Sequence, residues 1–222
     1  MEAKVKVALE ALIHVYGDSE QIATDVIAPG LIQVFDSDQP FMEKVAAMDG
    51  VFDEEPRFDE LREYVFDLLL INFFTTDVEK LEADYLESPE WEAIEEDTLD
   101  RGSELLNILL YLRECKDDEV EPSLGDFLKE FLLVEEDEFQ DEYRIYERVI
   151  ANQILIDSNY QEIARVAQQF EADDELATLF YPLLAFFSDA SPSADQITEY
   201  KANATNPSLD TALLQLMITF NA

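Results

Sequence analysis

The sequence predicts an all-α fold, and three features of it support that prediction. Apolar residues recur at the three- and four-residue spacing of a helix face along almost the whole chain. No segment alternates apolar and polar residues over the length of a strand, and the 5 glycines are too few for many hairpin turns. We therefore expect an irregular multi-helix bundle of about 8–10 helices, with α-solenoid-like stacking as the alternative.

Glycine and proline set the expected limits of the first helices. Residues 5–16 place their apolar side chains on one helix face, and Gly17 is expected to end that helix. A second helix is expected over 18–28, before Pro29 and Gly30 break the pattern. The same reasoning predicts further helices over 40–50, 56–74, 77–86, 88–99, 105–115, 123–134, 136–156, 159–170, 174–187 and 209–220.

Three later boundaries follow from local backbone chemistry. Ser88 followed by Pro89 is typical of a helix start, with serine as the cap and proline in the first turn. Ser158 or Asn159 is expected to cap the helix that follows it. Pro182 lies inside an apolar helical pattern and should kink or split that helix.

The segment from Tyr64 to Phe74 is apolar at nearly every position, which predicts a central, buried helix. Glu60, Glu63 and Asp67 fall three and four residues apart on this helix. We interpret them as one exposed stripe, because a buried carboxylate would need a partner or a raised pKa. Asn72 is expected in the core, bonded to a neighbouring backbone group.

No linker in the chain is long or polar enough to require a domain boundary. We therefore expect a single helical domain over 1–222, with 49–56 and 188–194 as weak alternative boundaries.

The charge of the chain is strongly negative and concentrated in its middle. The formal net charge is −38, and residues 51–148 hold 33 acidic against 9 basic residues. With 48% hydrophobic residues the chain can still bury a core, unlike an acidic disordered protein. Long-range repulsion disfavours direct contact with nucleic acid or an anionic membrane surface.

Few features speak to location. Cys115 is the only cysteine, which suits a reducing compartment. No apolar h-region follows Met1, and the longest apolar run, 68–71, is too short to span a bilayer. These features favour a cytoplasmic protein. The only histidine, His14, is expected on the surface, opposite the apolar stripe of its helix.

The densest carboxylate cluster lies at 135–142. Glu135, Glu138 and Glu142 are spaced so that they could bind a divalent cation between helices, as in all-helical nucleotide pyrophosphatases. Asp137 and Asp141 fall opposite the apolar seam of the predicted helix and are expected to face solvent. The scarcity of basic groups for phosphate argues against the enzyme, and we expect no cofactor.

The pattern favours a non-catalytic interaction module that binds a basic protein. The likeness to immunity proteins and nucleic-acid mimics is one of charge alone. The expected surface of the module comprises Glu95, Glu96, Asp97, Asp137 and Asp141. Two alternatives remain: the carboxylate–metal hydrolase, and a salt-adapted protein whose acidity implies no partner. The sequence does not decide the oligomeric state.

Stability is expected to depend on salt. Spread over a folded surface of roughly 10,000 Å², the excess charges lie about 16 Å apart. The Debye length at physiological ionic strength is about 8 Å, so repulsion is screened there but not at low salt. We expect the melting temperature to rise between low and moderate ionic strength. A melting temperature that is the same at both would contradict this expectation.

Overall fold

The computed structural model describes residues 1–77, 85, 88–135, 138–139, 145–171, 174 and 176–222. The fold is all-helical, as predicted, apart from one short pair of strands. The chain forms two compact units, Met1–Leu106 and Asn107–Ala222. The two suggested boundaries lie inside these units, 49–56 in the first and 188–194 in the second. That the chain is one domain stays a prediction.

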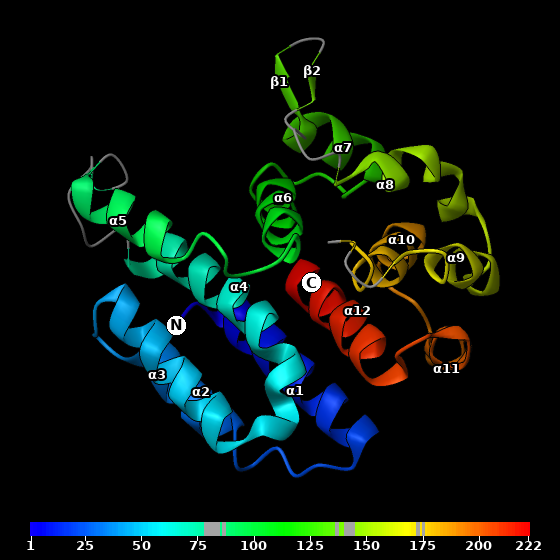
Figure 1. The fold of residues 1–222 in the computed structure, drawn as a ribbon. Coiled ribbons are helices and arrows are strands. Elements are labelled where there is room, and N and C mark those ends of the chain that lie inside the picture. The colour runs from blue at the N-terminus through cyan, green and yellow to red at the C-terminus, as the bar shows by residue number, and fades with distance from the viewer. Residues whose placement is uncertain (78–84, 86–87, 136–137, 140–144, 172–173, 175) are drawn as a thin grey trace. The chain divides into compact units, whose positions relative to one another are not determined.

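The first unit contains five α-helices, together with the start of a sixth, in its described part (Figure 1). Their bounds are α1 (Ala3–Glu20), α2 (Ala28–Asp36), α3 (Phe41–Glu54), α4 (Arg62–Asn72) and α5 (Pro89–Asp97). A 3-10 helix, η1 (Pro56–Leu61), precedes α4, and a π-helical turn, η2 (Phe73–Asp77), follows it.

The second unit holds most of α6 (Leu105–Asp117) and everything after it. Its other helices are α7 (Leu124–Leu132), α8 (Glu147–Ala151), the 3-10 helix η5 (Gln153–Asp157), α9 (Tyr160–Ala167), α10 (Phe180–Ser188), α11 (Ala194–Asn203) and α12 (Pro207–Asn221). Strands β1 (Leu133–Glu135) and β2 (Glu138–Phe139) pair antiparallel after α7.

The predicted end of the first helix and start of the second are wrong. Helix α1 runs through Gly17 to Glu20, and Gln21 ends it with a φ of 59°. At Gly17 a Cβ would collide with the side chain of Thr24, so the glycine allows the following turn to pack against the helix. Pro29 lies in the first turn of α2, where a missing N–H costs nothing, so it starts a helix rather than breaking one.

The expected long helix over 136–156 is also wrong. Described residues 138–139 form β2, and helix resumes only in α8 and η5. In a helix, the carboxylates of 135–142 would face one another at three- and four-residue spacing, which is destabilising. Pro182 does not kink its helix, because α10 begins at Phe180 and places the proline in its first turn.

Helix α4 is the centre of the first unit, as its apolar pattern predicted. It contacts α1, α3 and both flanking short helices, and α2 packs against α3 beside it (Figure 1). Its side chains from Tyr64 to Leu69, and those of Ile71 and Asn72, are buried. The largest fully buried aromatic side chains of this unit are Phe35, Phe52, Phe58 and Phe66.

The second unit packs its last four helices around tyrosine rings. Helix α10 contacts α9 and α12, and α11 contacts the same two helices. The rings of Tyr181 and Tyr200 stack with centroids 4.4 Å apart, and Tyr160 meets Tyr200 edge-on at 5.5 Å. Tyr200 donates its hydroxyl to the Asp210 carbonyl at 3.0 Å, and Tyr181 donates to the Tyr200 carbonyl at 2.9 Å. In the described part of the chain, no helix is both long and apolar enough to cross a membrane.

Tyr200 is fully buried, so its substitution tests this packing. We expect Tyr200→Phe to cost about 1 kcal/mol through its lost hydrogen bond. We expect Tyr200→Ala to cost about 3–5 kcal/mol, because it also leaves a cavity between the stacked rings. Urea unfolding of both variants would measure these costs. The exposed Ile154→Ala is the control, and equal costs for Tyr200→Ala and the control would contradict the prediction.

Candidate functional site

The acidic surface predicted on the fifth helix is present. Glu95, Glu96 and Asp97 are exposed in α5, while Trp91 and Ile94 turn inward. The Ser88 hydroxyl accepts a hydrogen bond from the Trp91 amide at 3.2 Å, which confirms the predicted cap. We call Glu95, Glu96 and Asp97 the α5 acidic face. Within the described residues, no cation forms an ion pair with any of the three.

The carboxylate cluster at 135–142 is only partly described. Asp137, Asp141 and Glu142 lie outside the described residues. Glu135 and Glu138 are paired across β1 and β2, and only their backbone is described. Among the described residues, no group of three or more potential ligands is arranged to hold a metal ion. The roles suggested for these five residues therefore stay predictions.

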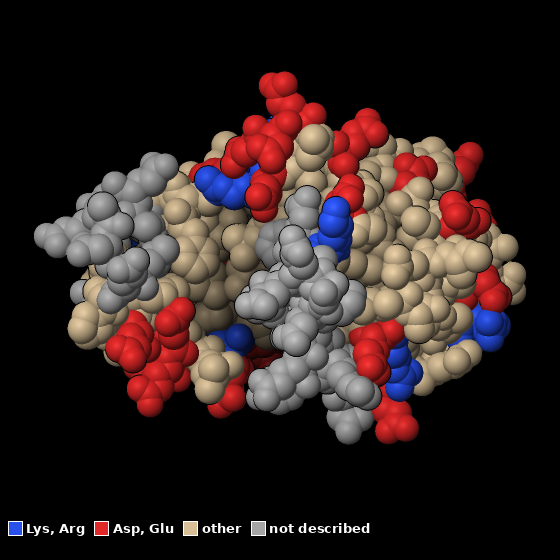
Figure 2. Space-filling view, turned by 90° about the horizontal axis from the view of Figure 1, so that it is seen from above, with Lys and Arg blue, Asp and Glu red and all other residues tan. Residues whose placement is uncertain are grey.

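The arginines in the described part of the chain form ion pairs with its own carboxylates. Each arginine in the described part forms an ion pair of 4 Å or less, and the set is Arg57, Arg62, Arg101, Arg113, Arg148 and Arg165. Figure 2 shows blue basic residues beside red acidic ones, with further red residues that stand apart from any blue. The positive charge of the described arginines is thus neutralised within the molecule. Exposed carboxylates such as those of the α5 acidic face have no such partner among the described residues.

The burial of Asp67 contradicts the predicted exposed stripe. Glu60 is exposed, Glu63 is partly buried and Asp67 is 0% exposed, so the stripe runs from solvent into the interior. Asp67 accepts two hydrogen bonds from Ser103, one from its amide at 3.0 Å and one from its hydroxyl at 2.6 Å. The interpretation of Asp67 as a solvated residue is therefore wrong, because the loop before α6 covers it.

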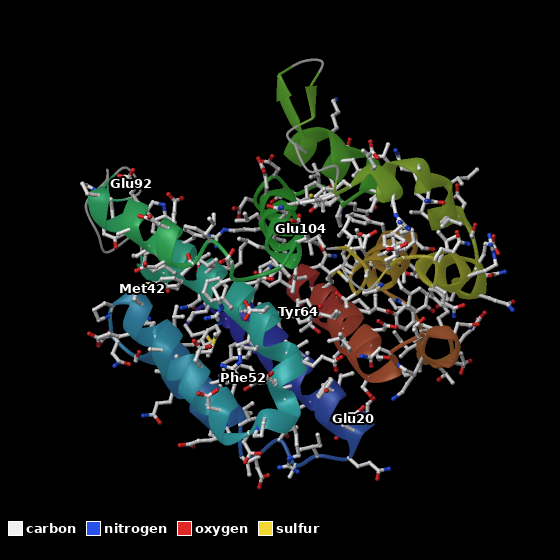
Figure 3. All side chains as sticks on the ribbon, in the orientation of Figure 1. Glu20, Met42, Phe52, Tyr64, Glu92 and Glu104 are labelled. Carbon is white, nitrogen blue, oxygen red and sulfur yellow. The ribbon has the colours of Figure 1, made fainter. Side chains whose placement is uncertain are left out.

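Arg101 fastens the same loop to α3 and α4. Its guanidinium forms a two-pronged pair with Asp49, both distances being 3.1 Å, and its Nε lies 3.1 Å from a Glu63 oxygen. It also stacks over the Phe66 ring, 4.9 Å from the centroid. Planar bidentate pairs of this kind are among the stronger charged contacts in proteins. Figure 3 shows the side chains of this region, with Phe52 on α3, Tyr64 on α4 and Glu104 before α6 as labelled landmarks.

Gly102 is required by this arrangement. Its φ is +84°, a conformation that residues with a side chain rarely adopt. A Cβ at this position would lie 2.6 Å from an Asp67 oxygen and 3.3 Å from the Phe66 ring. Its amide donates to Glu63 at 2.7 Å. Arg101, Gly102 and Ser103 thus form a tight loop that satisfies the two inner carboxylates of α4.

Burial raises the pKa of Asp67 well above its ordinary value, and nearby Glu63 and Glu104 raise it further. The two hydrogen bonds from Ser103 oppose this shift but do not cancel it. In the structure Asp67 therefore serves as an anchor for the loop through its two bonds to Ser103.

Asn72, His14 and Cys115 are the other side chains for which the sequence suggested a position. Asn72 accepts a hydrogen bond from the Glu2 amide at 2.9 Å, as expected of a core amide, while its Nδ2 has no partner in the described structure. His14 is exposed, as predicted, with Nδ1 lying 2.8 Å from the Thr24 hydroxyl. Cys115 is buried near the end of α6 and forms no disulfide.

No protein-family model matches the chain, and comparison with curated proteins and with solved structures finds no significant match.

Asp67→Asn tests the anchor and its protonation. A folded-state pKa above the unfolded value means that the folded protein binds the proton more tightly, so the wild type loses stability as pH rises above 3.8. Asparagine can still accept from the Ser103 amide and carries no charge. We expect Asp67→Asn to gain stability relative to the wild type as pH rises, measured by urea unfolding. Asp67→Ala should cost about 2 kcal/mol or more at all pH values, because it strands both Ser103 donors. A pH-independent difference for Asp67→Asn would contradict this.

Proposed function

We propose that the chain is a non-catalytic interaction module, and that the α5 acidic face binds a basic protein. The observation that carries the proposal is the difference between paired and unpaired charge. The described arginines pair with carboxylates of the chain itself, whereas Glu95, Glu96 and Asp97 are exposed and have no cationic partner among the described residues.

Such a surface attracts a partner of opposite charge before the two molecules touch. An ion pair at 4 Å in water contributes only about 1 kcal/mol, so no single carboxylate suffices. Several carboxylates on one helix face act together on an approaching basic surface and raise its association rate. The net charge of −38 extends this attraction beyond the helix and repels nucleic acid and anionic lipid. We propose the cytoplasm as the compartment, because Cys115 is the only cysteine and forms no disulfide.

The other two functions have less support. The metal-dependent hydrolase rests on Glu135, Glu138 and Glu142, whose side chains lie outside the described part of the structure. Salt adaptation predicts that neutralising exposed carboxylates changes the stability of the chain in molar salt and does not change its binding to any partner. Substitutions in the α5 acidic face distinguish salt adaptation from the interaction module, because only the module requires carboxylates clustered on one surface.

Capture from a lysate of the source organism, followed by titration with the purified partner, tests the proposal. The wild type is compared with a triple variant of the α5 acidic face, Glu95→Gln, Glu96→Gln and Asp97→Asn. We expect the wild type to retain a basic protein at low ionic strength and to release it at high ionic strength. The triple variant should bind the purified partner more weakly, mainly through a slower association rate.

The matched control neutralises three exposed carboxylates elsewhere, by Asp18→Asn, Asp157→Asn and Glu171→Gln. It loses the same charge, so a similar loss of affinity in both triple variants would show that the α5 acidic face is not the binding surface. If no basic protein is retained by the wild type, the chain is not a module of this kind.

A further inference from the structure

A polar cavity of about 260 Å³ lies within the second unit. It is lined by residues 158–160 at the start of α9, by 188–189 at the end of α10, and by Gln196 and Glu199 on α11. Six of these seven residues carry a hydroxyl, amide or carboxylate side chain at an exposed or partly exposed position, and none of them is basic. The remaining residue, Tyr160, is buried.

Two carboxylates give the cavity its charge. Asp189 accepts hydrogen bonds from the Gln196 side chain and from the Ser191 amide, both at 2.9 Å, which fix its orientation. The carboxylate of Glu199 has neither a hydrogen bond nor an ion pair with any described residue. The start of α9 carries a partial positive charge of about one half, which two full negative charges outweigh. The cavity therefore attracts cations.

Tyr160 adds a hydroxyl group to the lining of the cavity. Its side chain is 7% exposed, and its ring is fixed edge-on against Tyr200. Its hydroxyl forms no hydrogen bond within the described structure. Burial raises the pKa of this hydroxyl, and nearby Asp189 and Glu199 raise it further. The neighbouring hydroxyls of Tyr181 and Tyr200 both have backbone partners. The Tyr160 hydroxyl instead lines the cavity, where it can bond to a ligand.

We propose that this cavity binds the cationic end of a lysine or arginine side chain, supplied by the basic protein of the proposed function, on which this inference rests. An ammonium group offers three donors and a guanidinium five, and both require acceptors around them. The Glu199 carboxylate, the free lone pairs of Asp189 and the Tyr160 hydroxyl supply such acceptors. The apolar part of the side chain would then lie toward the mouth of the cavity.

The size of the cavity agrees with a ligand of this kind. Its volume is roughly nine times the 30 Å³ that a water molecule occupies in the liquid. Pockets for drug-sized molecules and cofactors begin at about 300 Å³ and are mostly apolar. A polar space below that size fits the end of one side chain. Its two carboxylates exclude phosphate and other anions.

Nuclear magnetic resonance titration of the full chain tests the proposal with defined probes. The probe is the blocked tripeptide acetyl-Gly-Lys-Gly-amide, and its uncharged control carries norleucine in place of lysine. We expect the lysine peptide to shift the amide signals of 158–160, 188–189 and 196–199 in a saturable way. The norleucine peptide should leave them unchanged.

Two variants and a control locate the binding. Glu199→Gln and Tyr160→Phe each remove one acceptor, and we expect each to weaken the affinity by about two- to tenfold. Neither group has a hydrogen bond within the described structure, so both variants should have the melting temperature of the wild type. Glu95→Gln loses the same charge on the α5 acidic face and should leave the affinity for the tripeptide unchanged.

Shifts that spread over the acidic surface without saturating would overturn the proposal. So would an equal loss in Glu199→Gln and Glu95→Gln, or no binding of the lysine peptide at all. The two proposals fail in different ways. If a basic protein is captured but Glu199→Gln does not weaken it, the module stands and the cavity is not its anchor. If the tripeptide binds in the cavity and no basic protein is captured, the cavity binds cations and the module is wrong.

Discussion

The burial of α4 is the constraint on which the first unit depends. This helix is apolar on nearly every side, so it must be covered by the helices around it. Asp67 is carried fully inward with it and Glu63 partly so, and a carboxylate taken from water needs compensating hydrogen bonds. The loop from Arg101 to Ser103 supplies them, with a guanidinium and an amide for Glu63 and two donors for Asp67. The requirement for glycine at 102 follows from the close approach of that loop.

This arrangement divides the acidic residues into two classes with different roles. Inner carboxylates such as Asp49, Glu63 and Asp67 are paired with arginine or with backbone amides, and they hold elements of the fold together. Outer carboxylates such as Glu95 and Glu96 contribute little to stability, because exposed charges are hydrated and screened. Since the described arginines pair with acidic residues of the chain itself, the field around the molecule comes from the unpaired outer carboxylates. Neutralising outer carboxylates can therefore change recognition while leaving the fold intact.

The sequence predicted what local chemistry decides. The helix caps at Ser88 and Asn159 each depend on one local hydrogen bond from a backbone amide to the side chain, and the structure has both. The central position of α4 followed from its apolar composition alone. Asp67 was misplaced because its partners lie more than thirty residues away, in a loop whose approach no spacing reveals. One signal was present, since Asp67 has apolar neighbours on both sides and Arg101-Gly102-Ser103 combines a cation, a flexible residue and a donor.

Tyrosine packing in the second unit extends this reasoning from stability to recognition. The ring of Tyr200 contacts the rings of both Tyr160 and Tyr181. The packing of the three rings therefore also fixes where their hydroxyls lie. Tyr181 and Tyr200 direct theirs at backbone carbonyls, where the hydrogen bonds stabilise the helix packing. Tyr160 lies at the end of the chain of rings, beside the carboxylates of Asp189 and Glu199. The Tyr160 hydroxyl thus adds a polar group to the cavity and not a hydrogen bond to the helix packing. The same row of rings therefore serves the packing of the helices at one end and the lining of the cavity at the other.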